Sequence, residues 1–230
     1  EVDTAFPMIA YTERPDRFCA GLVEGRVGVI VDGIPLGYLL PGTVGQFFKT
    51  GQDRAQNWVA ASFLSVLRYL CMLLSLFLPA WYVAAVNFHP EMIPARLAWS
   101  ISEAKTDVPF STIFEVLIMV VGSAAVEASI VSPVVLIVVA IAGIAGYTVP
   151  SQEFAAALRI WRFGLAIAAS LGGLFGVMAL AAVLVYRLAQ LESFGVPYLT
   201  PFAASGDERA QGHGVIRWPT HWVKFRERAL

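Results

Sequence analysis

Charged residues are scarce in this chain. They make up 14% of its 230 residues, whereas hydrophobic residues make up 57%. A typical soluble domain is about a quarter charged, so this composition favours a protein that faces lipid over much of its surface. The formal net charge is −1. Because a protein that binds nucleic acid needs a basic face, we expect no nucleic-acid partner.

The chain also lacks the short motifs that carry much enzyme chemistry. It contains no P-loop, no nucleophile elbow and no dinucleotide-binding fingerprint. Its three histidines are dispersed, and no group of histidine, cysteine and carboxylate residues has the spacing of metal ligands. The sequence therefore predicts a protein that is not an enzyme and that uses no metal or other cofactor.

Cysteine is rare, and a secretion signal is missing from the opening residues. Cys19 and Cys71 are the two cysteines, which are too few for a disulfide framework. Cys71 lies in an apolar run, where a small buried thiol is expected. The chain opens on Glu1 without the basic and apolar regions of a signal peptide. We interpret it as a fragment or a processed chain.

Long apolar runs are what the chain does contain. Residues 132–149 carry no charged side chain, and the runs at 63–86 and 160–186 are also strongly apolar. A membrane-spanning helix needs roughly 20 apolar residues. The predicted fold class is mainly α, a polytopic helical membrane protein with about four membrane helices, over 62–86, 110–130, 133–149 and about 160–187. The 110–149 stretch could instead hold a re-entrant segment.

Polar segments flank the predicted membrane helical domain, 58–190. Residues 1–57 are expected to be the remnant of a cytosolic α/β domain, small and incomplete. Residues 191–230 form a basic C-terminal tail, and an excess of lysine and arginine marks the cytosolic side of a membrane. Four membrane elements place head and tail on the same side.

Local patterns predict the elements between these landmarks. A short helix is expected over 15–25, followed by a β-hairpin that turns at Asp32-Gly33. Residues 95–104 are typical of an amphipathic helix at a membrane interface. In that helix we expect lipid-facing apolar side chains, namely Leu97, Ile101 and Trp99.

Two carboxylates lie in otherwise apolar stretches. Glu115 and Glu127 would each cost several kcal/mol at membrane depth unless solvated, paired or protonated. They indicate a water-filled pathway or a site for protons or cations. The alternative is that one of them lies at the interface, or is neutral and hydrogen-bonded. Glu115 is closer to a predicted helix end, where solvation costs less.

Small residues surround Glu127. Ser123, Glu127 and Ile130 share one helix face through their i, i+4 and i+7 spacing, and a face with a hydroxyl and a carboxylate could line a pore. Small residues such as Gly122 equally favour a tight seam between two helices.

A further pair of small residues occurs in the last apolar run. Gly172 and Gly176 form a GxxxG motif, and small residues let helices approach closely in lipid. The motif predicts a close helix crossing, either within the chain or between copies of it.

Five strings along the chain carry a family resemblance. They are TERPDRFCAGLVEGRVGVIVDG (12–33), LRYLCMLLSLFLPAWYVAAVNFHPEMIP (67–94), VPFSTIFEVLIM (108–119), AAVEASIVSPVVLIVVAIAGIA (124–145) and SFGVPYLTPFA (193–203). Together, over about residues 6–205, they resemble the A subunit of GerA-family spore germination proteins.

The resemblance implies a subunit of a nutrient-germinant receptor in the inner membrane of bacterial spores. It implies B and C subunits as partners and a homo-oligomeric ring. The membrane helices of that ring would form a nutrient-gated channel for monovalent cations across the lipid bilayer.

The chain departs from the family pattern at an internal point. Between Met119 and Gly122 the family carries a further segment, whereas here LIMVVGSAA joins the two sides directly. A true deletion would remove about one membrane element, and the prediction of four elements would then change.

The leading hypothesis is an oligomeric cation channel in which Ser123 and Glu127 attract or relay cations. Val126 or Ile130 would form an apolar gate that closes by dewetting, and Glu115 is a further candidate for the pathway. The alternative is a scaffold subunit of the receptor that conducts nothing, which the tight seams fit equally well. A secondary transporter would need inverted repeats or paired broken helices, and the sequence has no convincing internal repeat.

Overall fold

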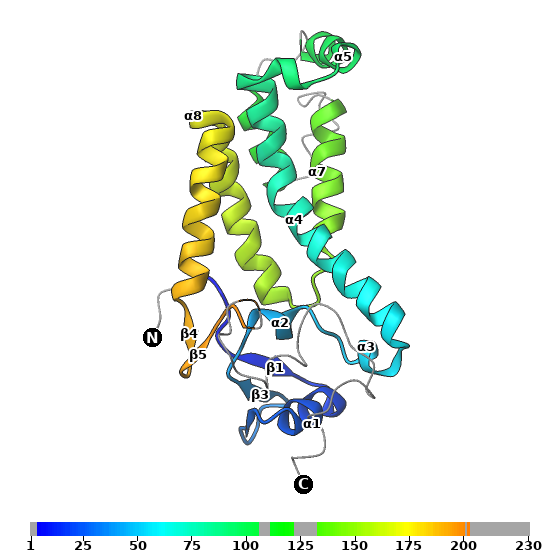
Figure 1. Ribbon diagram of the computed structural model, residues 1–230, viewed down its shortest axis with the longest axis vertical. Coiled ribbons are helices and arrows are strands. Elements are labelled where there is room, and N and C mark those ends of the chain that lie inside the picture. Colours follow the sequence, from blue (N-terminus) through cyan, green and yellow to red (C-terminus); the bar gives the residue numbers. More distant parts are fainter. Residues whose placement is uncertain (1–3, 106–110, 122–132, 201, 203–230) are drawn as a thin grey trace. The chain divides into compact units, whose positions relative to one another are not determined.

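The computed structural model describes residues 4–105, 111–121, 133–200 and 202. The chain divides into two compact units. Unit 1 comprises Glu1–Tyr69, Val149–Phe154 and Tyr186–Leu230, and unit 2 comprises Leu70–Thr148 and Ala155–Val185. The described chain is mainly helical with small sheets, as Figure 1 shows, which confirms the predicted predominance of helix.

Unit 1 contains a three-stranded antiparallel sheet. Its strands are β1 (Ala10–Thr12), β2 (Val27–Ile30) and β3 (Gly37–Leu40), in the order β1-β3-β2. β2 and β3 form the predicted hairpin, with Val27 opposite Leu40. Gly33 in the connecting loop has φ +80°, which glycine adopts without the steric cost that a Cβ brings. The hairpin prediction is confirmed.

Helix α1 (Pro15–Val23) forms where the sequence predicts a helix. It begins at a proline, whose fixed φ suits the first turn, and Gly25 just beyond its end has φ +83°. Its Phe18 side chain lies over the sheet. A Cβ added at Gly28 or Gly37 would lie 2.6 Å from the Phe18 ring, so these two glycines leave room for it.

Short elements from both ends of the described chain complete unit 1. They are α2 (Val44–Phe47), α3 (Gln52–Ala55), β4 (Glu192–Ser193) and β5 (Val196–Pro197). The Ser193 hydroxyl accepts a hydrogen bond from the Gly42 N–H (3.2 Å) and donates one to the Met8 carbonyl (2.8 Å). The residues that follow α8 therefore pack directly on the head.

An aromatic cluster lies in unit 1, with Phe202 exposed at its edge. Its members are Phe6, Phe47, Phe48, Tyr69, Phe154, Tyr198 and Phe202. Phe154 is fully buried, and its ring centroid lies 5.4 to 5.8 Å from those of Phe6, Phe47 and Phe48. The first turn of α8 is thereby anchored in unit 1.

Helices form most of unit 2. In chain order they are α4 (Trp58–Phe88), the 3-10 turn η1 (Pro90–Met92), α5 (Ala95–Lys105), α6 (Thr112–Val121), α7 (Pro133–Gly146) and α8 (Gln152–Gln190). α4 begins in unit 1, and α8 begins and ends there. α4 and α8 are long and apolar enough to cross a membrane. Of the helix predicted over 110–130, residues 110 and 122–130 lie outside the described residues.

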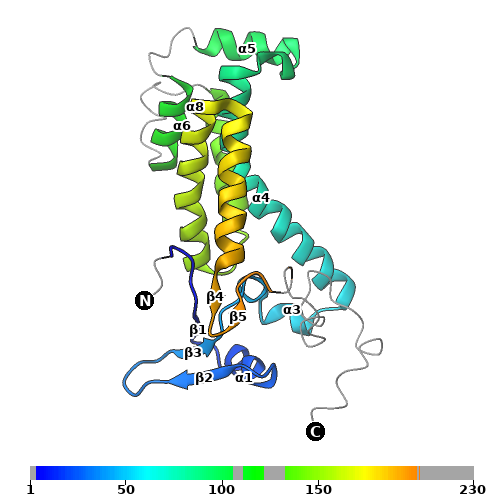
Figure 2. The same cartoon turned by 60° about the vertical axis from the view of Figure 1, so that its left-hand side comes forward.

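Helix α8 is bent rather than straight. Gly173, within it, has φ +55° and ψ −140°, a conformation that side chains with a Cβ rarely adopt. Figure 1 and Figure 2 both show its two arms, 152–172 and 174–190, side by side. The expectation of one uninterrupted span over about 160–187 is therefore wrong.

Helix α5 forms as predicted, but one of its side chains faces the other way. Trp99 is 79% exposed, whereas Ile101 is only 8% exposed. α5 packs against α7, and Ile101 is buried in unit 2. The expectation that Ile101 faces lipid is wrong, while the exposure of Trp99 fits the expected orientation.

Candidate functional site

Most residues of the predicted ion pathway lie outside the described residues. These are Ser123, Val126, Glu127 and Ile130. Gly122, which is predicted to pack between helices, also lies outside the described residues. Their arrangement stays a prediction. Glu115, Gly172 and Gly176 are described, and each has a distinct surrounding.

Glu115 is a buried carboxylate in the first turn of α6. Its side chain is 1% exposed. The free N–H groups at a helix N-terminus favour a negative charge nearby, which offsets part of the cost of burial. The neighbouring Thr112 hydroxyl, also buried, donates a hydrogen bond of 3.1 Å to Asn87 Oδ1 near the end of α4. This end of unit 2 thus holds two polar side chains, Thr112 and Glu115, away from its surface.

A second polar contact inside unit 2 was not predicted as a site. Arg162, in α8, is 7% exposed, and its Nη2 donates a hydrogen bond to the Ser75 hydroxyl of α4, which is 3% exposed. Arg162 lies near the start of the helix predicted over about 160–187. A usable signal existed, because Leu158, Arg162, Leu165 and Ala169 recur at helical spacing and all are buried.

The end of α7 lies at the same contact. A Cβ added at Gly146 would lie 2.9 Å from Ser75 Oγ and 3.2 Å from Arg162 Nη2. Glycine leaves the space that the guanidinium and the hydroxyl occupy. α4, α7 and α8 therefore meet at one buried cation.

The GxxxG glycines lie on either side of the bend in α8. A Cβ at Gly176 would lie 2.2 Å from the Ala168 carbonyl oxygen, whereas nothing lies within 4 Å of a Cβ at Gly172. At Gly176 the two arms therefore approach closely, whereas Gly172 is open. Phe88 packs on the bend itself, 3.0 Å from a Cβ built on Gly173.

An ion pair joins α3 to the first turns of α4 within unit 1. Arg68 Nη1 and Nη2 lie 2.6 and 2.9 Å from the two Asp53 carboxylate oxygens, and Nη1 also donates to the Phe48 carbonyl at 3.0 Å. Burial alone would raise the pKa of the Asp53 carboxyl. The hydrogen bonds from Arg68 and from the Thr50 N–H (2.8 Å) outweigh this and hold the pKa below its usual value.

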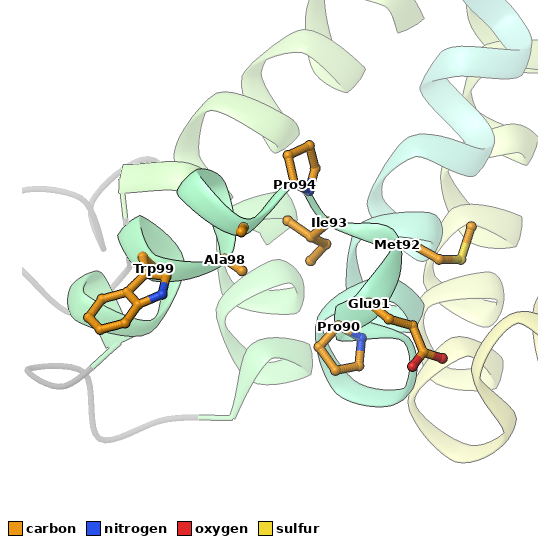
Figure 3. Close-up of a pocket in the computed structure, with 8 residues that line it drawn as sticks. Pro90, Glu91, Met92, Ile93, Pro94, Ala98 and Trp99 are labelled. Atoms are coloured by element: carbon orange, nitrogen blue, oxygen red, sulfur yellow. The ribbon is translucent and has the colours of Figure 1, made fainter.

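An open cavity of about 600 Å³ lies along η1 and the start of α5. Figure 3 shows that proline, methionine, isoleucine and tryptophan side chains line it, with Glu91 as the charged residue. Its lining has no catalytic arrangement of nucleophile and base. Among the residues that the structure describes, no group of three or more histidine, cysteine, aspartate or glutamate residues could hold a metal ion.

Comparison with protein families agrees with the resemblance of the five strings. The model of the GerA family, described as Bacillus/Clostridium GerA spore germination protein, matches residues 2–122 and 119–229. The two matched segments meet at 119–122. This is the point at which the sequence departs from the family pattern.

Curated relatives cover the same stretch. Spore germination protein B1 of Bacillus subtilis (strain 168) is 36% identical over 249 residues, which takes in 96% of this chain and 51% of the relative. The uncharacterized membrane protein YfkQ of the same organism is 35% identical, over 85% of this chain and 44% of the relative. Spore germination protein GerLA of Bacillus cereus is 33% identical over 253 residues, which takes in 98% and 51%.

The alignments differ in length from the chain in an informative way. The chain spans about half the length of these relatives. Two of the alignments nevertheless run over 249 and 253 residues, more than the 230 of this chain. Those relatives therefore contain residues inside the matched region that this chain lacks. No solved structure matches the chain.

Proposed function

Since the chain belongs to the GerA family of Bacillus/Clostridium spore germination proteins, we propose that it is the A subunit of a nutrient-germinant receptor. In this proposal it forms an oligomeric, nutrient-gated channel for monovalent cations in the inner membrane of the spore. Its partners are the B and C subunits of the receptor. The observation that carries the proposal is that the family match runs through both the head and the apolar helices.

The packing of unit 1 supports a multi-pass arrangement. Unit 1 brings together three separate stretches of chain, which touch through contacts such as Ser193 with Met8 and Phe154 with Phe47. Residues packed in one such unit lie on one side of a membrane. The chain between Tyr69 and Val149 must then cross an even number of times, and so must the chain between Phe154 and Tyr186.

Four crossings meet this condition. α4 leads away from unit 1 and α7 leads back, after which the two arms of α8 cross and return. Each arm of α8 is close to the roughly 20 residues that a span requires. The head is then residues 1–57, the membrane helical domain 58–190 and the cytosolic tail 191–230.

The ion pathway is assigned to the helix face that carries Ser123 and Glu127. Their hydroxyl and carboxylate would replace part of the hydration of a cation, and Val126 or Ile130 would close the path by dewetting. Glu115 supports this assignment, because it places a carboxylate in the interior of unit 2. The relatives are named as spore germination proteins and not as enzymes, and we expect no catalytic activity.

Removal of the Glu127 charge tests the pathway. Glu127→Gln keeps the size of the side chain, and we expect it to lower cation flux and cation selectivity several-fold in vesicles that contain the full chain. Glu91→Gln is the matched control, since Glu91 is exposed on η1, and should change neither. Equal flux and selectivity in the wild type and Glu127→Gln would remove Glu127 from the pathway.

A non-conducting scaffold subunit is the second candidate. It is favoured by the internal residues that the relatives have and this chain lacks, since a shortened membrane domain can still hold partners together. A scaffold would form a stable oligomer and bind the B and C subunits without passing current.

A further inference from the structure

We propose that Arg162 is a positioning residue that latches α7 to α4 in the resting, non-conducting arrangement. The latch consists of the Arg162 guanidinium, the Ser75 hydroxyl and the C-terminal end of α7 at Gly146. The flux readout of this inference rests on the proposed channel function. The contacts that define the latch do not.

The first observation is a cation enclosed by apolar helices. The Arg162 side chain is 93% buried, since 7% of its surface is exposed. Its Nη2 bonds to Ser75, whereas its buried Nε has no hydrogen-bond partner among the described residues. An arginine in such surroundings is costly unless something compensates its charge. This cost indicates a role for Arg162 beyond packing.

The second observation identifies what compensates the charge. Gly146 is the last residue of α7, and the carbonyl groups at a helix C-terminus carry partial negative charge. The guanidinium Nη2 lies 3.2 Å from a Cβ built on Gly146, so the cation lies at that end of the helix. The attraction between Arg162 and α7 is therefore electrostatic as well as steric.

The third observation is that no room remains between Gly146 of α7 and Ser75 of α4. A Cβ at Gly146 would come within 2.9 Å of Ser75 Oγ, so a methyl group there pushes α7 away from α4. Ala142 and Val139 on α7 are buried as well. Arg162 is therefore enclosed by side chains of the helices around it.

These observations assign the latch to the resting state. A cation path must be hydrated, and an enclosed arginine that has no carboxylate partner in the described part of the chain repels cations that approach it. α7 directly follows the segment assigned to the ion pathway, so movement of α7 changes that pathway. Opening would then separate α7 from Ser75 and hydrate Arg162.

The test measures potassium efflux from vesicles that contain the full chain, without nutrient. Ser75→Ala removes the acceptor and Gly146→Ala displaces α7, and we expect both to raise basal efflux several-fold. The controls are Arg187→Gln, at an exposed position on the same helix, and Gly143→Ala, where nothing lies within 4 Å of the added Cβ. Both controls should keep the wild-type efflux.

The charge itself is tested at Arg162. Arg162→Gln should raise basal efflux, and Arg162→Lys, which keeps a cation near the end of α7, should restore part of the wild-type value. Equal efflux from the Gln and Lys variants would contradict a role for the charge. Unchanged efflux in Ser75→Ala and Gly146→Ala, with a conducting wild type, would overturn the resting-state role.

A second measurement does not depend on conduction. The unfolding equilibrium of the purified protein in detergent is measured for Ser75→Ala, for Arg162→Gln and for the double variant. If the latch exists, the double variant should lose less unfolding free energy than the sum of the losses in the two single variants. Additive losses would overturn the latch. If vesicles with the wild type and with every variant showed no potassium efflux, and the losses of unfolding free energy were not additive, the latch would be supported and the channel refuted.

Discussion

In unit 1 the fold is fixed by aromatic and polar side chains from distant parts of the chain, whereas unit 2 is built mainly from apolar helices. In unit 1, Phe154 stacks on Phe47, and Ser193 bonds to Met8. In unit 2, the buried polar side chains among the described residues are Ser75, Thr112, Glu115 and Arg162. The two units therefore depend on different interactions.

This difference shows where function is to be sought. In an aqueous unit, hydrogen bonds and ion pairs are common and mostly structural. In apolar helices each buried polar group is costly, so a carboxylate or guanidinium that persists there points to a role beyond packing. Glu115 and Arg162 are the charged members of that set in the described part of unit 2.

A substitution that disrupts the close packing of the two arms of α8 should have the largest effect on stability. Gly176→Ala places a methyl group against the backbone of Ala168, which forces the arms apart and should cost about 3 kcal/mol of unfolding free energy. Denaturation of the purified protein in detergent measures this. Gly172→Ala is the control, because its added Cβ meets nothing within 4 Å. Equal losses in both variants would contradict the bend at Gly173.

Loss of the ion pair between Asp53 and Arg68 in unit 1 should have the second-largest effect on stability. Asp53→Ala leaves Arg68 without its carboxylate and the Thr50 N–H without its acceptor, and should cost about 2 kcal/mol. Asp16→Ala removes a similar pair with Arg14, but that pair is exposed, so its loss should have little effect. If both variants unfolded alike, the Asp53 pair would contribute no more than a surface pair does.

A single buried hydroxyl tests the attachment of the residues after α8. Ser193→Ala removes one of the two acceptors of the Gly42 N–H, which also donates to the Met8 carbonyl (2.9 Å), and removes the hydroxyl that donates to that carbonyl. It should cost about 1 kcal/mol. Faster hydrogen exchange at the Gly42 amide would locate the loss. Glu192→Ala, at the exposed neighbouring position, should leave that exchange rate unchanged, and protection of Gly42 in both variants would refute the attachment.

The smallest expected effect is a pH dependence confined to unit 1. The pKa of Asp53 is lower in the folded state than its usual value, so its ion pair stabilises the protein fully above about pH 4, the ordinary pKa of aspartate. That stabilisation is lost as the pH falls through the lowered folded pKa. As the pH is lowered, the free energy of unfolding should therefore fall more steeply in the wild type than in Asp53→Asn. Identical acid profiles would contradict the role of this carboxylate.

Local patterns in the sequence predict much of the secondary structure. Helix α1, the β2–β3 hairpin and helix α4 follow from proline, glycine and apolar runs, because their causes lie within a few residues. The burial of Glu115 could not be predicted in this way. The sequence left open whether that carboxylate is solvated, and helix packing decides it.

Long-range contacts account for what the sequence did not predict. The bend in α8 depends on Gly173 adopting a positive φ beneath Phe88, yet the same glycines also suit an ordinary helix crossing. The burial of Arg162 depends on Ser75 and Gly146, which are far from it in sequence. A charged residue near a predicted helix end is usually assigned to the interface, and only the packing of three helices assigns it to the interior.

The most direct test of the account is single-channel conductance of the purified, reconstituted chain, beside a version with the residues that its relatives carry near 119–122 restored. The account predicts cation-selective current from this chain as well as from the restored version. Silence from both, with a well-defined oligomer in the membrane, would contradict the channel and favour the scaffold.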